Sequence, residues 1–368
     1  MSGAKSGSVN AFASLGRARR YFLKAATLAT AGMSVAAMLD GWKSAIAKTL
    51  SSDSPSDCGN MNIPMKEVEG KVAFITGGSS GIGLGIARAF SDAGMKVVIG
   101  YRTKEHLDEA MKFFVADRIH AVKLDVTVRS DMEKAASEAE RVFGKVHVLV
   151  NNAGVLTAGS LSETTYDDWD WTIGVNLNGV FNGMHTFLPR IQSHNEGGQI
   201  ISISSIAGLF RGGGGVYSVS KFAVVGMMEA LRGDLFETNI GVSVCCPGLV
   251  SSNIMDSDRN RPTSLGNSGP QFDKRTRAEV RREMEDPKLA MDPLEAGRLV
   301  LRGMRNNDLY ILTHPEWASC FRARHEALMA SIPAHLHPSA ERLADARSTL
   351  QQTIYVRERD RKLCERNV

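Results

Sequence analysis

Val72-Ala73-Phe74-Ile75-Thr76 is followed directly by Gly77-Gly78-Ser79-Ser80-Gly81-Ile82-Gly83, and then by a helical apolar pattern that continues to Phe90. The apolar run predicts a buried strand, the glycine-rich stretch a tight turn, and the periodic stretch a helix. Glycines at such a turn let the backbone approach a pyrophosphate, and the free N–H groups at the start of the helix attract its negative charge. The order of strand, glycine turn and helix therefore predicts a dinucleotide-binding unit.

Further apolar strands alternate with helical patterns along the chain. The predicted strands are 97–99, 121–124, 146–150, 200–203 and 242–246, and the predicted helices are 104–115, 130–143, 167–192, 218–238 and 293–304. This alternation is typical of an α/β fold with a single Rossmann-like, doubly wound parallel sheet and helices on both faces. We expect this domain at 66–315, followed by a C-terminal helical extension at 316–368 that includes a charged amphipathic helix at 339–364.

The composition excludes several classes of protein. Of the 368 residues, 43% are hydrophobic and 23% charged, which is ordinary for a globular protein and excludes collagen-like, disordered and multi-span membrane chains. Five cysteines indicate neither a disulfide framework nor a metal site, and we expect no metal. Six of the 44 basic residues and one of the 40 acidic residues lie in the first 47 positions, which leaves 38 and 39 in the body. Without a basic excess there, we expect no nucleic-acid binding.

The N-terminus has the pattern of a targeting signal. Arg19-Arg20-Tyr21-Phe22-Leu23-Lys24 precedes an uncharged apolar run from Ala25 to Leu39, and Ala45-Ile46-Ala47 follows. The run is too short for a stable membrane span, and the paired arginines resemble a twin-arginine (Tat) signal. We therefore expect a signal peptide at 1–47, a linker at 48–65, and export to the periplasm by the twin-arginine machinery. The alternative is a cytoplasmic protein whose leader is not a signal, or whose true start is Met61 or Met65.

Beyond the glycine turn, further motifs occur in an order known from one family. They are Asp125-Val126, Asn151-Asn152-Ala153-Gly154, Asn176, Ser205, Tyr217-x-x-x-Lys221 and Pro247-Gly248. Through these motifs the chain resembles the short-chain dehydrogenases/reductases (SDR) over 65–310. It implies an NAD(P)-dependent oxidoreductase that interconverts a secondary alcohol and a ketone, assembled as a homodimer or homotetramer.

A looser resemblance narrows the substrate. The stretches 164–171, 174–180, 241–245 and 309–311 look like those of bacterial Cα-dehydrogenases that oxidise lignin-derived aryl ethers. This likeness implies an aromatic or otherwise bulky hydrophobic substrate. The glycines at 212–215 leave space for such a molecule, although they also serve as a simple flexible loop. In the family, the segment after Pro-Gly covers the substrate, which places a lid at about 253–293.

The expected catalytic residues are Asn176, Ser205, Tyr217 and Lys221. Tyr217 and Lys221 are four residues apart, so they share one face of a helix. A free tyrosine has a pKa of about 10, and a neighbouring ammonium together with the positive nicotinamide should lower that value, which suits Tyr217 as general acid/base. By resemblance, Asn176 holds a water that relays protons to Lys221. A chain that kept the fold without turnover, as a nucleotide-binding scaffold or redox sensor, is the alternative.

The catalytic serine has two candidates. Ser204 and Ser205 are adjacent, and neighbouring side chains of a strand point to opposite faces. Gly208 follows Ser205 by three residues, as in the family pattern, so we assign the role of orienting the substrate oxygen to Ser205, with Ser204 as the alternative.

The end of the second predicted strand bears on the choice of nucleotide. Gly100-Tyr101-Arg102 contains no carboxylate for the ribose hydroxyls of NAD, and Arg102 has the planar fork that pairs with a 2′-phosphate. NADP is thus favoured over NAD, although the Cα-dehydrogenases typically use NAD. The other expected cofactor contacts are Gly77, Ser79, Ser80, Gly81, Ile82, Gly83, Tyr101, Asp125, Val126, Asn152, Ala153, Gly154, Tyr217, Lys221, Pro247, Gly248 and Val250.

Overall fold

The computed structural model describes residues 63–366, apart from 212–213, 267–268 and 352. The predicted signal at 1–47, most of the linker at 48–65, and Gly212 and Gly213 lie outside the described residues. Within the described part, no helix is long and apolar enough to cross a bilayer.

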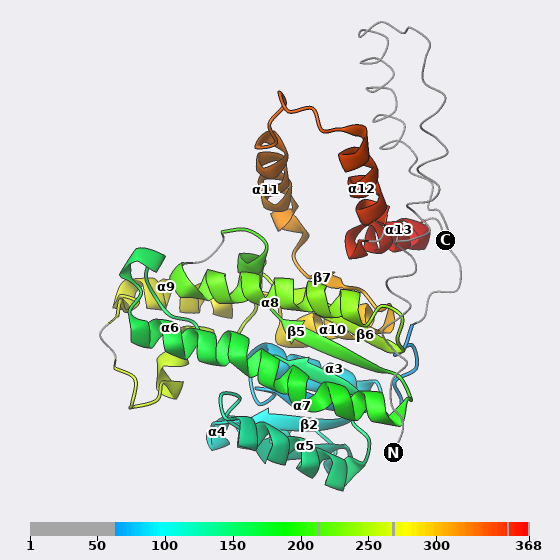
Figure 1. Cartoon of the computed structure of the whole chain (residues 1–368). Helices are drawn as coiled ribbons and strands as arrows, with labels where there is room; N and C mark the ends of the chain where they lie inside the picture. The colour runs from blue at the N-terminus through cyan, green and yellow to red at the C-terminus, as the bar shows by residue number, and fades with distance from the viewer. Residues whose placement is uncertain (1–62, 212–213, 267–268, 352, 367–368) are drawn as a thin grey trace, which may run out of the picture. The chain divides into compact units, whose positions relative to one another are not determined.

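Seven parallel strands form one sheet, in the order β3-β2-β1-β4-β5-β6-β7 (Figure 1). Their bounds are Val72–Thr76 for β1, Lys96–Tyr101 for β2, Ile119–Lys123 for β3, Val148–Asn151 for β4, Gly198–Ile203 for β5, Ile240–Cys246 for β6 and Tyr310–Leu312 for β7. The predicted doubly wound sheet is confirmed. Its order reverses between β1 and β4, and ligands of such sheets bind at the carboxyl ends of the strands beside this point.

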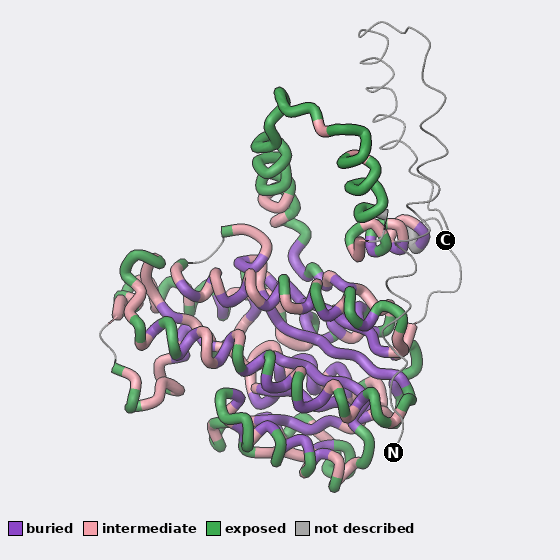
Figure 2. The backbone as a smooth tube through the Cα atoms, viewed as in Figure 1, coloured by how far each residue is buried: buried purple, intermediate pink, exposed green. Residues whose placement is uncertain are grey.

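Helices cover both faces of the sheet, as predicted. On one face lie α5 (Arg129–Phe143), α7 (Gly179–His194) and α8 (Gly215–Asp234), and on the other α3 (Gly81–Asp92) and α10 (Pro293–Arg305), with α4 (Lys104–Met111) near β2. Neighbouring residues of a strand point to opposite faces, so Phe74 packs with the first group and Ile75 with the second. The fully buried strands between the two helix layers are the purple band in Figure 2.

Two predicted helices are interrupted. The helix expected at 167–192 consists of α6 (Tyr166–Ile173), a π-helical turn at Gly174–Asn178, and α7. The charged helix expected at 339–364 is divided into α12 (Ala340–Gln351) and α13 (Ile354–Arg366). Within the segment predicted as a lid, the structure has a short helix η5 (Ile254–Asn260) and α9 (Lys274–Glu285).

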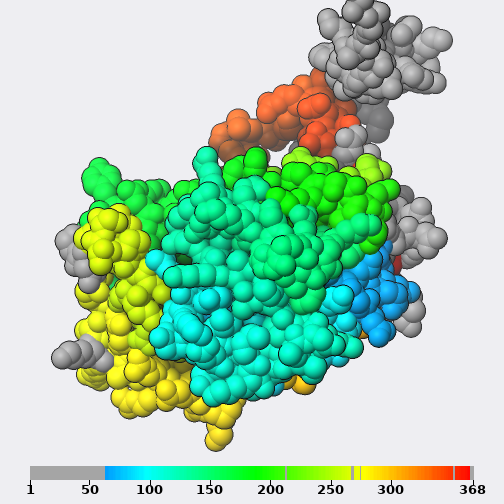
Figure 3. All heavy atoms as spheres, turned by 90° about the horizontal axis from the view of Figure 1, so that it is seen from below, coloured from blue at the N-terminus to red at the C-terminus, as the bar shows by residue number. Residues whose placement is uncertain are grey.

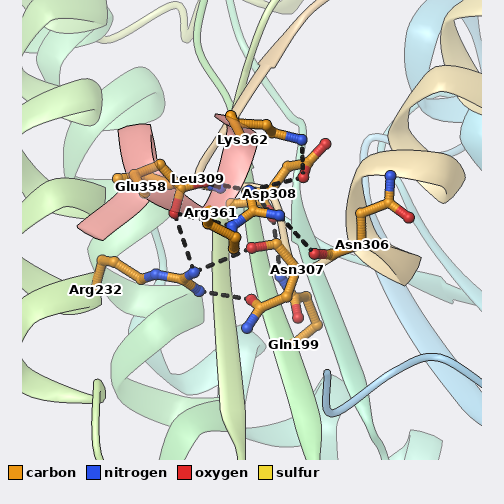
Figure 4. A network of polar contacts seen from close by, with 10 residues as sticks. Gln199, Arg232, Asn306, Asn307, Asp308, Leu309, Glu358, Arg361 and Lys362 are labelled. Atoms are coloured by element: carbon orange, nitrogen blue, oxygen red, sulfur yellow. Dashed lines mark hydrogen bonds and ion pairs between the residues drawn. The ribbon is translucent and has the colours of Figure 1, made fainter. Parts of the chain in front are cut away.

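The C-terminal helical extension is confirmed, and its last helix is anchored by buried charges. It begins with η6 (Pro315–Trp317) and α11 (Ala318–Ala330), and α11 and α12 are exposed along almost their whole length (Figure 2). Glu358 of α13 accepts a hydrogen bond from the backbone N–H of Leu309 at 2.8 Å, and Arg361 pairs with Asp308 at 2.8 Å (Figure 4). Arg232 of α8 completes this network, 3.3 Å from Glu358. The network joins α13 to the residues just before the edge strand β7.

The described cysteines are in two states. Cys364, in α13, is disulfide-bonded, whereas Cys245, Cys246 and Cys320 are free thiols. Neither the number nor the spacing of the cysteines in the sequence indicated this bond.

Candidate active site

One cleft at the carboxyl ends of β1, β2, β4, β5 and β6 brings the predicted site residues together. Of the residues predicted to contact substrate or cofactor, Gly83 and Asn176 alone do not line it. The lining residues from that prediction are Gly77, Ser79, Ser80, Gly81, Ile82, Tyr101, Arg102, Asp125, Val126, Asn152, Ala153, Gly154, Ser205, Tyr217, Lys221, Pro247, Gly248 and Val250.

The glycine turn between β1 and α3 fits a pyrophosphate. Gly77 and Gly81 have positive φ angles of 64° and 50°, which residues with a side chain rarely adopt. Gly83 lies beneath the turn, where a Cβ would be 2.2 Å from the Gly77 carbonyl oxygen. The N-cap residue Ser80 makes no side-chain hydrogen bond to the first turn of α3, so the N–H groups of that turn are open to a phosphate.

Polar contacts from the residues just after β4 hold this turn in place. The Asn152 side-chain amide donates to the carbonyl oxygens of Thr76 and Gly77, both at 3.0 Å. In return, the Thr76 hydroxyl accepts from the backbone N–H groups of Asn152 and Ala153 at 2.9 and 3.0 Å. These hydrogen bonds hold the glycine turn against the start of the segment that follows β4. The residues present fit a dinucleotide, although the sequence did not indicate this role for Thr76.

Three of the predicted catalytic residues, Tyr217, Ser205 and Lys221, lie close together in the cleft. The Ser205 hydroxyl is hydrogen-bonded to Tyr217, and Lys221 Nζ lies 5.6 Å from the centre of the Tyr217 ring. Lys221 Nζ donates to the carbonyl oxygen of Ile203 at 3.0 Å. All three residues line the same cleft.

Burial controls the charges of this group. It raises the pKa of Tyr217 above the usual value and outweighs the hydrogen bond with Ser205, which lowers it. Burial also lowers the pKa of Lys221 to about 8. The sequence predicted a lowered pKa for Tyr217 from the neighbouring ammonium and the nicotinamide. In the protein alone the desolvation of the phenolate is the larger effect.

The two adjacent serines have different partners. Ser204 is buried, and its hydroxyl donates to the backbone oxygen of Lys221 at 2.8 Å. Ser205 Oγ accepts from the backbone N–H of Ala207 at 3.1 Å and is also bonded to Tyr217. This arrangement favours Ser205 as the residue that orients the substrate. Ser204 instead forms a hydrogen bond with the backbone of α8.

Asn176 lies in the π-helical turn, behind the cleft. Its Oδ1 accepts from the backbone N–H of Val155 at 2.8 Å, and its Nδ2 donates to the Val155 oxygen at 2.9 Å and to Ser220 Oγ at 3.1 Å. A Cβ on Gly154 would lie 3.4 Å from Asn176 Oδ1 and 3.6 Å from Lys221 Nζ, so both side chains border the loop after β4. The predicted relay through Asn176 stays a prediction, and the observed contacts fix the loop after β4.

The opposite end of the cleft contains the residues expected near the adenosine. Arg102 and Asp125 form an ion pair at 3.4 Å. Thr103 and His106, from the start of α4, line the same region. The segment predicted as a lid adds Asn253, Ile254, Ser257, Arg259, Asn260 and Met284 to the lining.

His314 is a residue near the site that sequence reasoning missed. It follows β7, is buried, and accepts a hydrogen bond at Nδ1 from the Gly248 N–H at 3.0 Å. Its Nε2 bonds the Leu249 carbonyl oxygen at 3.0 Å, so the ring holds the turn after β6. A single histidine after a three-residue strand gives no signal of this role in the sequence.

A second polar cluster lies outside the cleft, among His147, His194 and Glu196. His147 accepts from the Val72 N–H at Nδ1 and bonds Glu196 Oε2 at 3.0 Å through Nε2. His194 accepts from the Glu196 N–H and bonds the Val146 oxygen at 3.0 Å. Since all four ring nitrogens are engaged by the protein, the cluster has a structural role between β1, β4 and the end of α7.

Comparisons with known proteins agree with the fold and the enzyme class. A family model described as short chain dehydrogenase matches residues 71–263. The C alpha-dehydrogenase of Sphingobium sp. strain SYK-6 is 38% identical over 284 residues, which is 76% of this chain and 92% of the relative. A crystal structure of a short chain dehydrogenase/reductase from Burkholderia phymatum in complex with NAD is 33% identical. It has a TM-score of 0.67, and the match covers 74% of this chain and 99% of that one. The apo form of LigO from Sphingobium sp. strain SYK-6 is 36% identical, with a TM-score of 0.63 and 78% and 98% coverage.

Proposed function

The chain belongs to the short-chain dehydrogenase/reductase family of oxidoreductases, and from this premise we propose that it interconverts a secondary alcohol and a ketone with NADP. The observation that carries the proposal is the meeting of Tyr217, Ser205 and Lys221 in the cleft that begins at the glycine turn. The C alpha-dehydrogenase relative supports the same reaction class.

Each side chain has a distinct task in this proposal. A bound nicotinamide supplies or accepts the hydride. Tyr217 gives a proton to the substrate oxygen, or takes one from it, and Ser205 holds that oxygen by a hydrogen bond. Because burial raises the pKa of Tyr217, the neutral phenol is the main form near neutral pH, which suits proton donation to a ketone. Lys221, as a cation, stabilises the phenolate that this donation leaves.

The preference for NADP rests on the end of β2. Tyr101 and Arg102 occupy the position where a carboxylate would bind the ribose hydroxyls of NAD, and both line the cleft. Thermal unfolding of the full chain with NADPH, NADH or neither tests this preference. A ligand at one hundred times its Kd stabilises a protein by about 2.7 kcal/mol. We expect that stabilisation with NADPH at concentrations where NADH gives much less, and the opposite order would reverse the assignment.

The proposed substrate is aromatic or otherwise bulky and hydrophobic. Phe210 stacks on Trp317 with ring centres 5.5 Å apart, and Phe321 packs edge-on against Phe210 at 5.7 Å. A Cβ on Gly248, which lines the cleft, would be 3.1 Å from Trp317 Nε1, so these aromatic rings adjoin the catalytic end. The proposal also includes export to the periplasm through the twin-arginine pattern at 19–24 and assembly as a homodimer or homotetramer.

The test of the reaction is the variant Tyr217→Phe. With NADPH and acetophenone or larger aryl ketones, the loss of NADPH absorbance measures turnover, and NADPH fluorescence measures binding. Removal of the hydroxyl should lower kcat by about 10²- to 10⁴-fold while the Kd for NADPH stays within about twofold. Tyr166→Phe, at a tyrosine that is 90% exposed, is the matched control and should keep full activity. Undiminished turnover in Tyr217→Phe would refute the assigned chemistry.

A further inference from the structure

Residues 318–351 form an arm that extends away from the domain. The arm consists of α11, a connection at 331–339 and α12, and it leads to the anchored helix α13 (Figure 1). From 322 to 350 every residue is exposed except Pro338 and Leu343, which are half-buried. The orange spheres of the arm accordingly stand out from the rest of the molecule in Figure 3. Isolated helices of 12 or 13 residues are marginally stable in water, so these two need a partner that covers them.

Helix α11 carries an apolar face that its own domain covers only at the base of the arm. Trp317, just before the helix, and Phe321 pack on Phe210. Leu328 lies seven residues after Phe321, which places it two turns farther along the same face. The apolar side chains that are uncovered there are Leu328, Met329, Ile332 and Leu336, which are 54%, 53%, 59% and 60% exposed. A cluster of this kind marks an interaction surface.

Two arginines border this apolar face. Arg322 and Arg324 are both exposed, and the Arg324 guanidinium lies over the ring of Phe222 in α8, 5.4 Å from its centre. Because a helix has 3.6 residues per turn, positions one and three after Phe321 lie on opposite flanks of the face that Phe321 occupies. Glu326, the acidic residue of α11, lies on the far side of the helix. The arm therefore presents an apolar face with a positive charge on each flank.

A lipid surface fits the arm less well than a protein does. Residues 318–351 contain four arginines and three acidic residues, whereas anionic lipid attracts segments with a clear basic excess. The charges of α11 instead favour a protein surface that is apolar and acidic.

The same chain exposes such a surface at η2 (Leu161–Glu163) and α6, which we call the α6 surface. Its apolar members Leu161 and Trp169 are 54% and 39% exposed. Its acidic members are Glu163, Asp167 and Asp170. The sequence contains no lysine or arginine from 146 to 189, so this part of the chain supplies no positive charge to offset them. The α6 surface is thus apolar and acidic, whereas α11 is apolar and basic.

The two surfaces match in charge but do not cover each other within one chain, because both are exposed. We propose that the arm of one copy docks on the α6 surface of a second copy of this chain. The inference rests on the proposed function, whose assembly as a homodimer it specifies further. A two-fold axis makes the same contact twice, so one dimer covers both arms and is closed. Burial of the apolar side chains supplies affinity, and the charges select the partner surface.

Charge reversal tests the proposal, with the dimer Kd of the full chain measured by analytical ultracentrifugation. We expect the wild type to be a dimer at micromolar concentration. Arg322→Glu combined with Arg324→Glu should raise the Kd at least about 100-fold, because it places like charges together. Asp167→Lys combined with Asp170→Lys should do the same for the same reason. The chain with all four substitutions should return to within about tenfold of the wild-type Kd, since opposite charges then face each other again.

The apolar part of the contact is tested by Leu328→Gln, which should raise the Kd at least about tenfold. Leu289→Gln is the matched control, since Leu289 is 57% exposed and lies outside both surfaces, and its Kd should equal that of the wild type. Far-UV circular dichroism of each variant checks that the domain remains folded.

Four results would overturn the proposal. A wild-type monomer would refute it together with the proposed assembly, and a monomer that sediments with vesicles of phosphatidylcholine and phosphatidylglycerol would assign the arm to a lipid surface. An oligomer whose Kd resists all of these variants would retain the proposed assembly and put its contact elsewhere. Weakening by both charge reversals without recovery in the fourfold variant would show that the two surfaces do not face each other. The turnover of Tyr217→Phe tests the proposed hydride transfer separately.

Discussion

The substitution Gly85→Ala should separate the two helices that support the nucleotide end of the site. Gly85 lies inside α3, where a Cβ would be 1.7 Å from the carbonyl oxygen of Pro293 at the start of α10. Gly297 of α10 faces back, since its Cβ would be 2.2 Å from the Gly85 oxygen. Each helix thus meets the backbone of the other at a glycine, and a side chain fits at neither position.

The size of the effect follows from this overlap. Real Cβ atoms essentially never come closer than 3.0 Å to such a neighbour, so the helices must move apart by about 1.3 Å. Overpacking of this kind costs about 1–3 kcal/mol, and a contact with rigid backbone belongs at the upper end. The gain of an alanine in a helix interior, about 0.5–1 kcal/mol, offsets part of it. We expect a net loss of about 2 kcal/mol in the free energy of unfolding.

Gly226→Ala is the matched control for this prediction. Gly226 is also inside a helix, α8, but it is exposed and a Cβ there would meet nothing within 4 Å. The same change of residue should therefore stabilise the protein by about 0.5–1 kcal/mol. Urea unfolding followed by circular dichroism measures both variants. If Gly85→Ala were as stable as Gly226→Ala, the close approach of α3 and α10 described above would be incorrect.

Three further predictions concern the serines, a buried histidine and the disulfide. Ser205→Ala should lower kcat about 100-fold without a change in the free energy of unfolding. Ser204→Ala should lower the free energy of unfolding by about 1 kcal/mol and keep most of the activity. The opposite pattern would mean that Ser204 orients the substrate. Burial lowers the pKa of His147 in the folded protein, so the unfolded chain binds a proton at this residue more readily. The free energy of unfolding should therefore fall as the pH drops through the usual histidine range, about 6.5. Urea unfolding at pH 7.5 and 5.5 should show a weaker pH dependence in His147→Gln than in the wild type, and an equal dependence would contradict this cause. Because Cys364 is disulfide-bonded, alkylation of the denatured full chain should modify three of the four described cysteines before reduction and the fourth, Cys364, only after it; modification of all four before reduction would contradict the bond. The three are Cys245, Cys246 and Cys320.

The sequence was most informative where structure depends on neighbouring residues. The strand, glycine turn and helix from Val72 to Phe90 have local patterns, and the parallel sheet then brings the loops after several strands to one edge. For this reason most of the residues predicted to bind the cofactor line one cleft. The relative positions of Tyr217 and Lys221 were also predictable, because four residues make about one helical turn.

Features that depend on distant contacts were not predictable. His314 bonds Gly248 across 66 positions, and Glu358 bonds Leu309 across 49, without any periodic pattern that connects them. The raised pKa of Tyr217 results from burial, which no local pattern contains. The π-helical turn that contains Asn176 is a local irregularity within an otherwise regular helical pattern, so the sequence predicted one continuous helix.

The network around α13 has a consequence for the timing of folding during synthesis. Edge strands expose backbone groups that can pair with other chains, and the Leu309 N–H next to the edge strand β7 is satisfied by Glu358 of α13. Domains fold from their N-terminal parts while the ribosome is still adding residues, so the sheet can assemble before its last edge is covered. That edge is covered only once α13 has been synthesised and has docked. A chain without α13 would therefore leave the Leu309 N–H and Asp308 without the partners that Glu358 and Arg361 provide.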